Sequence, residues 1–119
     1  MMTLLSDAER ARALAQLPGW TLTEDGKALR RTFHFADFRS AFAAMTRLAF
    51  EAEAMNHHPD WTNVYNRLEV RLSTHDAGGL TKKDIALAQA STRTVYTPKP
   101  KPKGTPAQGA RERRILGAC

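Results

Sequence analysis

The chain has 119 residues, which is enough for one domain with its own hydrophobic core. It is 42% hydrophobic and 25% charged, as an ordinary soluble globular protein is, and its net charge is +6. The single cysteine, Cys119, excludes an intramolecular disulfide and a cysteine-based zinc site within these residues. We find neither a signal peptide nor the roughly 18 consecutive apolar residues of a membrane span, so we expect a cytoplasmic protein.

The first elements along the chain are a helix and a hairpin. Ser6 followed by Glu9 forms a capping box, and Pro18 ends the helix that it opens. Apolar and polar residues then alternate at 20–22 and again at 29–35, with turn-forming residues between the two runs. This pattern predicts two antiparallel strands.

A second helix is predicted from Asp37, which can cap it, to about Met55. Pro59 opposes any continuation of this helix because the residue before a proline is disfavoured in helical geometry. Apolar residues recur along the helix at steps of four, three and four, as on the core-facing side of a helix. This apolar stripe consists of Phe38, Phe42, Met45 and Ala49.

A second hairpin and a third helix follow. Residues 61–65 and 67–72 alternate as strands do, and Leu68, Val70 and Leu72 make the second run the clearest strand of the sequence. Thr81 followed by Asp84 is another capping box. The order αββαββα therefore predicts an α+β fold of two layers, with a four-stranded antiparallel sheet and helices on one face.

The positive charge is concentrated at the end of the chain. Residues 1–96 carry 12 Lys and Arg against 11 Asp and Glu, a net +1, and residues 97–119 carry six against one, a net +5. Alternating proline and lysine at 98–103 is typical of a disordered segment. We therefore expect a domain at 1–96 and a disordered basic tail at 97–119. The tail is either a functionless extension or a weak contact for nucleic acid or another polyanion.

Three of the four histidines lie just before or just after the second predicted hairpin. His57 and His58 come where the second helix ends, and His75 follows the last strand. If the two strands pair, the three imidazoles can surround one pocket. Imidazole gives and takes protons near neutral pH, which suits a reaction that delivers one proton and removes another. A carboxylate such as Glu53 or Asp84 could fix an imidazole tautomer.

Other interpretations of the same residues remain open. His57 and His58 could simply stabilise the end of a helix through its dipole. A zinc site of three histidines is conceivable, although neither HExxH nor CxxC is present. Asp84 could be no more than part of a capping box, and Trp61 could belong to the core or an interface. His34, in a predicted strand, is expected to be an exposed bystander.

The pattern of these residues resembles the pterin-4a-carbinolamine dehydratase family over residues 5–96. The resemblance implies a four-stranded antiparallel sheet with helices packed on one side, and homodimers or homotetramers. The residues that carry it are Glu53, His57-His58-Pro59, Trp61, Tyr65-Asn66, Leu72-Ser73-Thr74-His75, Gly79-Leu80-Thr81 and Asp84, with Leu17-Pro18-Gly19-Trp20, Phe33-His34-Phe35, Asp37-Phe38, Ala41-Phe42 and Met45 before them.

The resemblance also implies a reaction. It is the loss of water from a 4a-hydroxytetrahydropterin to give the quinonoid dihydropterin, without a metal or organic cofactor. Recycling of the pterin for aromatic amino acid hydroxylases, and a functional link to phenylalanine hydroxylase, are implied as well. By resemblance, His57 and His75 act as acids toward the hydroxyl, while His58 holds the ring and moves the N5 proton. The implied substrate-binding residues are Glu53, Asn56, Trp61, Ser73, Thr74, Asp76 and Asp84.

One residue departs from the family pattern. Many members carry an acid immediately before the two adjacent histidines, and this chain has Asn56 there. An amide does not supply the negative potential of a carboxylate, so we expect a weaker partner for the pterin amino group. Some animal members bind the dimerisation helices of a transcription factor. A protein-interaction module of this coactivator type is therefore the alternative function.

Overall fold

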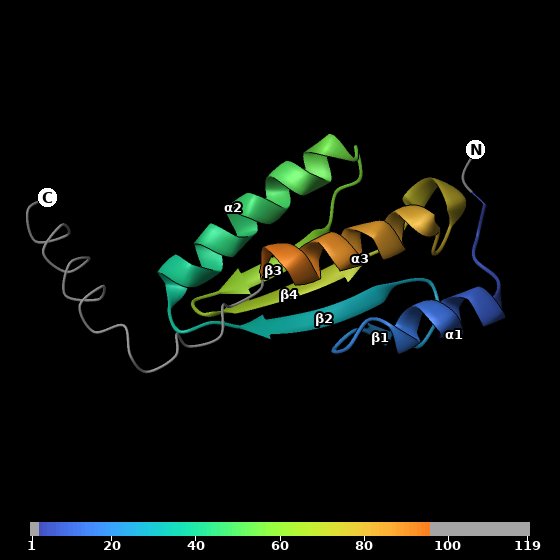
Figure 1. Ribbon diagram of the computed structural model, residues 1–119, viewed down its shortest axis with the longest axis horizontal. Coiled ribbons are helices and arrows are strands. Elements are labelled where there is room, and N and C mark those ends of the chain that lie inside the picture. Colours follow the sequence, from blue (N-terminus) through green and yellow to red (C-terminus); the bar gives the residue numbers. More distant parts are fainter. Residues whose placement is uncertain (1–2, 96–119) are drawn as a thin grey trace, which may run out of the picture.

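The computed structural model describes residues 3–95, and they form one α+β unit (Figure 1). The predicted class and the order αββαββα are confirmed, whereas the predicted tail at 97–119 lies outside the described residues. The elements in chain order are α1 (Asp7–Ala15), β1 (Thr21–Leu22), β2 (Leu29–His34), α2 (Phe38–Ala54), β3 (Asp60–Val64), β4 (Arg67–Leu72), the short 3-10 helix η1 (His75–Ala77) and α3 (Lys82–Thr94).

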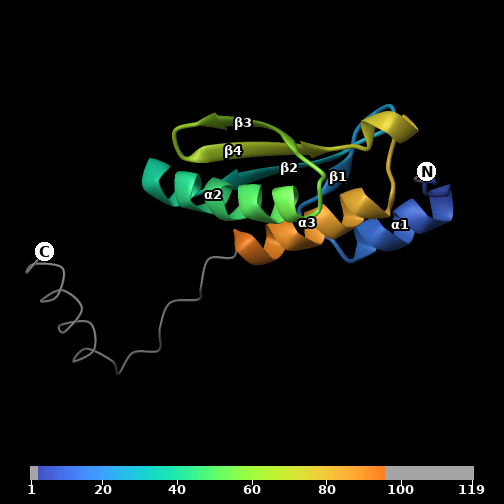
Figure 2. The same ribbon diagram turned by 90° about the horizontal axis from the view of Figure 1, so that it is seen from above.

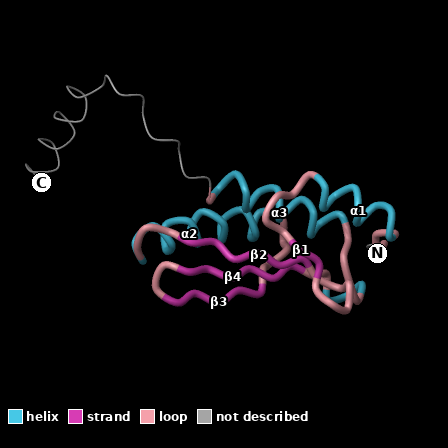
Figure 3. Tube along the Cα trace, turned by 90° about the horizontal axis from the view of Figure 1, so that it is seen from below, coloured by secondary structure: helices cyan, strands magenta, loops and turns pink. Residues whose placement is uncertain are grey.

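The four strands form one antiparallel sheet in the order β1-β2-β4-β3. Strand β4 is central: Leu72 pairs with Leu29 of β2, and Arg71 pairs with Asp60 of β3. The helices cover one face of this sheet, as Figures 2 and 3 show from two sides. Because β3 begins where β4 ends, residues 57–60 and 73–75 meet at the same end of the sheet.

The core lies between the sheet and the helices. In β4 the side chains of Leu68, Val70 and Leu72 are fully buried, as their alternation in the sequence predicts. The strand residues between them lie on the opposite face, since successive side chains of a strand alternate. The α3 residues Leu87 and Ala88 are buried as well. Removal of these apolar groups from water is the main stabilising contribution to the fold.

The prediction for the buried side of α2 is wrong. Phe38 and Phe42, expected to face the core, are 47% and 56% exposed, Met45 is partly buried, and Ala49 is exposed. The buried residues of α2 are Ala41, Ala44, Leu48 and Ala52. Three of these four are alanines, whose small side chains leave room for the helix to lie close to its neighbours.

No helix within residues 3–95 is long and apolar enough to cross a bilayer.

Candidate active site

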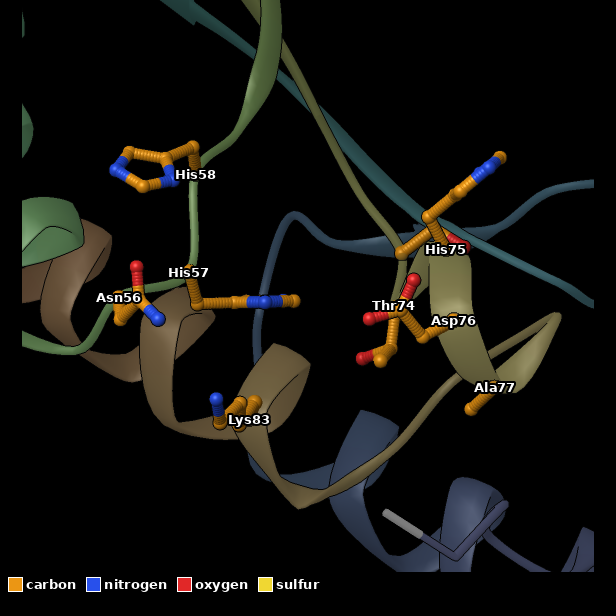
Figure 4. Close-up of a pocket in the computed structure, with 9 residues that line it drawn as sticks. Asn56, His57, His58, Thr74, His75, Asp76, Ala77 and Lys83 are labelled. Carbon is orange, nitrogen blue, oxygen red and sulfur yellow. The ribbon is translucent and has the colours of Figure 1, made fainter. Parts of the chain in front are cut away.

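A cavity of about 670 Å³ opens at the end of the sheet where β4 ends and α2 has just finished (Figure 4). All three histidines predicted to be catalytic line it, so the sequence correctly placed them around one pocket. The complete lining consists of Asn56, His57, His58, Ser73, Thr74, His75, Asp76, Ala77 and Lys83.

One wall of the cavity is formed by the residues that follow α2. Asn56 has a left-handed backbone with φ of 51°, a conformation that asparagine tolerates better than most residues. The chain turns there, and the backbone N–H of His57 donates to the carbonyl of Ala52 over 3.0 Å. This turn ends the helix and directs the His57 side chain into the cavity, where Figure 4 shows it extending toward Thr74.

The opposite wall is a tight loop between β4 and α3. The N–H of Thr74 donates to the carbonyl of Gly79 over 2.8 Å, and η1 fills the space between these two residues. Gly78 closes the loop with φ of 76°, which glycine adopts without steric cost. The closed loop holds Thr74, His75 and Asp76 at the edge of the cavity.

A buried carboxylate holds His57. His57 Nε2 lies 2.6 Å from Oδ1 of Asp84, and Asp84 is fully buried in the first turn of α3. A buried charge must be hydrogen-bonded, and the second oxygen of Asp84 accepts from the Thr74 hydroxyl over 2.7 Å and from the Thr81 N–H over 2.9 Å. Asp84 is therefore both the second member of the Thr81–Asp84 capping box of α3 and the partner of His57.

This pair fixes the chemistry that His57 can perform. An ionised carboxylate is an acceptor, so the hydrogen of the pair resides on Nε2 of the imidazole. The other ring nitrogen, Nδ1, is left to exchange a proton with a molecule in the cavity. A carboxylate behind a histidine also compensates the positive charge when the ring takes up a proton. His57 is thus equipped for general acid or base catalysis.

The other two histidines are held less firmly. His58 Nε2 lies 2.8 Å from Oε1 of Glu53, and both side chains are more than half exposed, so water screens this pair. His75 is exposed, and within residues 3–95 its side chain makes no hydrogen bond. In Figure 4 the His58 and His75 rings point away from the space between His57 and Thr74. They lie at the rim of the cavity.

The predicted substrate-binding residues divide into three groups. Four of them line the cavity, namely Asn56, Ser73, Thr74 and Asp76. Glu53 and Asp84 contact it through the histidines that they bind. Trp61 does not line it and packs against the hydrophobic core, as its alternative interpretation expected. Sequence reasoning missed Lys83 and Ala77, which also line the cavity.

The zinc site considered from the sequence requires ligands that converge on one point. His57 and His58 each direct Nε2 at a carboxylate, and Figure 4 shows their rings pointing in different directions. In the part of the chain that the structure describes, no group of three or more His, Cys, Asp or Glu side chains is placed to hold a metal ion.

Comparisons with known proteins give one family. The model of the family "Pterin 4 alpha carbinolamine dehydratase" matches residues 3–94. A relative from Afipia carboxidovorans, provisionally named a pterin-4-alpha-carbinolamine dehydratase, is 57% identical over 89 residues, which cover 75% of this chain and 89% of the relative. A relative of the same provisional name from Rhodospirillum rubrum is 53% identical over 95 residues, or 80% and 99% of the two chains.

Two solved structures share the fold. The crystal structure of a transcriptional coactivator/pterin dehydratase from Brucella melitensis superimposes with a TM-score of 0.77 at 38% identity, over 79% of this chain and all of that one. A pterin dehydratase-like protein described as a RuBisCO assembly factor of the alpha-carboxysome has a TM-score of 0.57 at 17% identity, over 67% and 93% of the two chains. The second similarity concerns the fold alone.

Proposed function

The chain belongs to the pterin-4-alpha-carbinolamine dehydratase family, and from this premise we propose that it removes water from a 4a-hydroxytetrahydropterin by histidine acid and base catalysis. The observation that carries the proposal is the His57–Asp84 pair at 2.6 Å, which lies beside a cavity lined by two further histidines. The reaction breaks the C4a–O bond and forms a C4a=N5 double bond. It needs one proton on the departing oxygen and the removal of another from N5.

His57 is the first acid of the proposed mechanism. With Nε2 hydrogen-bonded to Asp84, the protonated ring presents Nδ1–H to the 4a-hydroxyl, and the C4a–O electron pair leaves with the oxygen as water. His75, on the facing loop, is the second group that can donate to this oxygen. Asp84 stabilises the protonated form of His57 before transfer and keeps the ring in position afterwards.

His58 is the proposed base for the N5 proton. Its Nε2 faces Glu53, which leaves Nδ1 as the acceptor, and the pair of electrons from the N5–H bond becomes the new double bond to C4a. Solvent reprotonates His57 and deprotonates His58 after each turnover, because His57 has given one proton to the departing water and His58 has taken one from N5. The proposed mechanism therefore balances without a further reactant.

The pterin ring is proposed to lie with its pyrimidine half deeper in the cavity. The pyrimidine edge presents N–H donors and one carbonyl, and the cavity offers the Asp76 carboxylate, the Lys83 ammonium and the Asn56 amide as partners. Ser73 and Thr74 add hydroxyl or backbone contacts. Lys83 facing the carbonyl oxygen would also compensate charge on the ring as the C4a–O bond breaks.

Single substitutions of the three histidines test the proposed mechanism. The assay follows loss of a synthetic 4a-carbinolamine and subtracts the spontaneous dehydration measured without protein. We expect His57→Ala to lower kcat by about 100-fold or more, within the range for loss of a general acid or base, and His58→Ala and His75→Ala to lower it less. The matched control is His34→Ala, because His34 is an exposed histidine of β2 that does not line the cavity.

Two outcomes would contradict the mechanism. Wild-type protein that does not exceed the spontaneous rate would reject the dehydratase activity. A His57→Ala, His58→Ala, His75→Ala triple variant that retained the wild-type rate, with an unchanged circular dichroism spectrum, would reject the histidines while leaving the activity in place.

The setting of the reaction is also proposed. The product is recycled to the tetrahydropterin used by aromatic amino acid hydroxylases, phenylalanine hydroxylase among them, and no metal or organic cofactor takes part. We further propose a homodimer or homotetramer, supported by the exposed aromatic side chains of Phe38, Phe42 and Phe50 on α2. Sedimentation of the wild type and of Phe42→Asp tests this, with a smaller species expected for the variant.

The alternative function is a protein-interaction module of the coactivator type. The same exposed side chains of α2 favour it, and the name of the Brucella melitensis relative includes both activities. Phe42→Asp separates the two functions, because it leaves the residues around the cavity in place. Binding of a partner protein would be lost in this variant, while dehydration per folded subunit would be kept.

A further inference from the structure

One buried hydroxyl lies beneath the cavity without being part of its lining. Thr81 stands at the beginning of α3, and its side chain is fully buried. Its hydroxyl accepts from the N–H of Lys83 over 3.3 Å, as the cap of a helix does. The same hydroxyl lies 2.7 Å from the hydroxyl of Thr74, a residue of the cavity wall. The cap of α3 does not require this second contact.

The hydrogens of the two hydroxyls are placed by counting donors and acceptors. Each hydroxyl has one hydrogen, and an ionised carboxylate only accepts. The hydrogen of Thr74 therefore points to Asp84, whose Oδ2 lies 2.7 Å away. Thr74 is then the acceptor from Thr81, so the hydrogen bonds run in one direction, from Thr81 through Thr74 to Asp84. The other oxygen of that carboxylate accepts from His57.

Thr81 also connects the two walls of the cavity. Its backbone N–H donates to Asp84 over 2.9 Å, and this carboxylate holds His57 on one wall. Its hydroxyl contacts Thr74, whose own backbone N–H donates across the base of the facing loop over 2.8 Å. His75 follows Thr74 directly in that loop, so its place depends on where Thr74 is held. The separation of the two walls therefore depends on Thr81.

We propose that Thr81 is a positioning residue of the dehydration in addition to the cap of α3. This inference rests on the proposed function, in which His57 and His75 from facing walls donate to one departing oxygen. Two donors reach one atom only if their separation is fixed, and small displacements of a reacting group lower rates steeply. A hydroxyl that accepts a hydrogen bond also donates more strongly. The Thr81 hydroxyl thus sets the distance between the walls and strengthens the bond from Thr74 to the carboxylate.

Thr81→Val tests this role, because valine has nearly the shape of threonine without the hydroxyl. We expect kcat above the spontaneous blank to fall by about tenfold, as loss of a group that orients a histidine from behind does in metal sites. KM should change less, since Thr81 does not line the cavity. Thr81→Ser keeps the hydroxyl and should retain most of the wild-type kcat. A loss in Thr81→Ser as large as in Thr81→Val would overturn the role of the hydroxyl.

A double-mutant cycle separates positioning from capping. Thr74→Val removes the hydroxyl through which Thr81 is proposed to act, but leaves the hydrogen bond between Thr81 and the N–H of Lys83. Thr81→Val should therefore lower kcat by about tenfold in the wild type and by less than about twofold in the Thr74→Val background. The rate is expressed per folded subunit, with the folded fraction measured by circular dichroism. An equal loss in both backgrounds would show that Thr81 acts through the cap, and would overturn the proposal.

The matched control for the cap is Ser6→Ala. Ser6 caps α1 in a capping box of the same kind, its hydroxyl accepts from the N–H of Glu9 over 3.2 Å, and it does not line the cavity. Both Ser6→Ala and Thr81→Val should lower the free energy of unfolding, because each removes a cap. Only Thr81→Val should lower kcat. A kcat lowered equally in Ser6→Ala would overturn the positioning role.

A measurement without substrate separates this proposal from the proposed function. Nitrogen NMR at alkaline pH distinguishes an imidazole with its hydrogen on Nε2 from one with its hydrogen on Nδ1. Wild-type His57, held by Asp84, should show the Nε2–H form alone. In Thr81→Val the His57 signals should broaden and move toward the average of the two forms, while in Ser6→Ala they should stay as in the wild type.

Either result of the NMR measurement is independent of turnover. The change of the His57 signals in Thr81→Val alone would support the positioning role even if no carbinolamine were dehydrated. Wild-type His57 signals in Thr81→Val would overturn it even if dehydration were fast.

Discussion

The carboxylate of Asp84 and the imidazole of His57, 27 positions apart in the sequence, form a buried pair 2.6 Å apart. The same carboxylate caps α3 through its second oxygen. The position of the cavity histidine is therefore tied to the beginning of a helix, and one residue serves both stability and the proposed catalysis. Substitutions can separate the two roles because they use different oxygens.

Asp84→Asn is expected to reduce kcat by about 100-fold or more while the protein stays folded. If the amide oxygen takes the place of Oδ2, the NH₂ group faces His57 and donates to Nε2. That reverses the tautomer and places a hydrogen on Nδ1 of the neutral ring, and wrong-tautomer variants of such pairs lose activity on this scale. Activity is measured above the spontaneous blank, and folding by circular dichroism. The control is Asp37→Asn, which makes the same change at the cap of α2, away from the cavity.

Glu53→Gln is expected to lower kcat by no more than about fivefold. Glu53 pairs with His58 as Asp84 pairs with His57, but the side chains are 78% and 58% exposed, and exposed ion pairs contribute little. The two substitutions remove the same charge from equivalent partners, so the contrast isolates the effect of burial. A larger loss for Glu53→Gln than for Asp84→Asn would reverse the assignment of the main acid.

Thr74→Val should lower the free energy of unfolding by about 1–3 kcal/mol, because it leaves a buried carboxylate oxygen without one of its donors. The Thr74 hydroxyl donates to Asp84 over 2.7 Å and lies 2.7 Å from the hydroxyl of Thr81. Thr74→Ser keeps the donor and should restore most of the loss. Urea unfolding measures both. Destabilisation by serine with little or none by valine would mean that packing of the methyl group, and not the hydrogen bond, matters here, because valine keeps the methyl group and serine does not.

Local patterns in the sequence were sufficient for the elements and for the N-terminal caps of all three α-helices. The Thr81–Asp84 box is present with both of its hydrogen bonds, because a cap depends on residues three positions apart. The alternation of Leu68, Val70 and Leu72 likewise gave the buried face of β4, since polar residues separate them. The approach of His57 to His75 required one further step, the pairing of β3 with β4.

Features that depend on distant contacts were not predictable in the same way. The buried side of α2 was missed because Phe42 and Leu48 lie on different parts of one broad apolar side of the helix. Periodicity alone does not say which side the sheet covers. Lys83 was missed because a lysine at the start of a helix is ordinarily solvated. The pairing of β2 with β4 is a further distant contact that no local pattern indicates.

Leu48→Ala tests the observed orientation of α2. Leu48 is fully buried, so its truncation should lower the free energy of unfolding by about 2–5 kcal/mol. Phe50→Ala, two positions along the same helix and at a side chain that is 73% exposed, should change it by less than about 0.5 kcal/mol in the monomer. Unfolding is measured at two protein concentrations, because a contribution of Phe50 to an oligomer would grow with concentration. A loss of unfolding free energy for Phe50→Ala as large as that for Leu48→Ala, at both protein concentrations, would contradict the orientation.

Asp37 should make the stability of the protein fall at acidic pH. The N–H and hydroxyl of Ser40 hydrogen-bond to Asp37 and hold the pKa of its carboxyl below the usual range in the folded state. The unfolded chain therefore binds a proton more readily. The stabilisation is present above the unfolded pKa, about 4, and is lost as pH falls through the folded value.

Asp37→Asn keeps an acceptor for the N–H of Ser40 but does not titrate. The free energy of unfolding, measured by urea from pH 7 to pH 3, should therefore fall less steeply below about pH 4 in this variant than in the wild type. The free energy of unfolding of Asp37→Asn should still fall somewhat as pH decreases, because hydrogen bonds also lower the pKa of Glu9 and of Asp25. Parallel profiles for the two proteins would show that the cap of α2 does not contribute to the acid sensitivity of the fold.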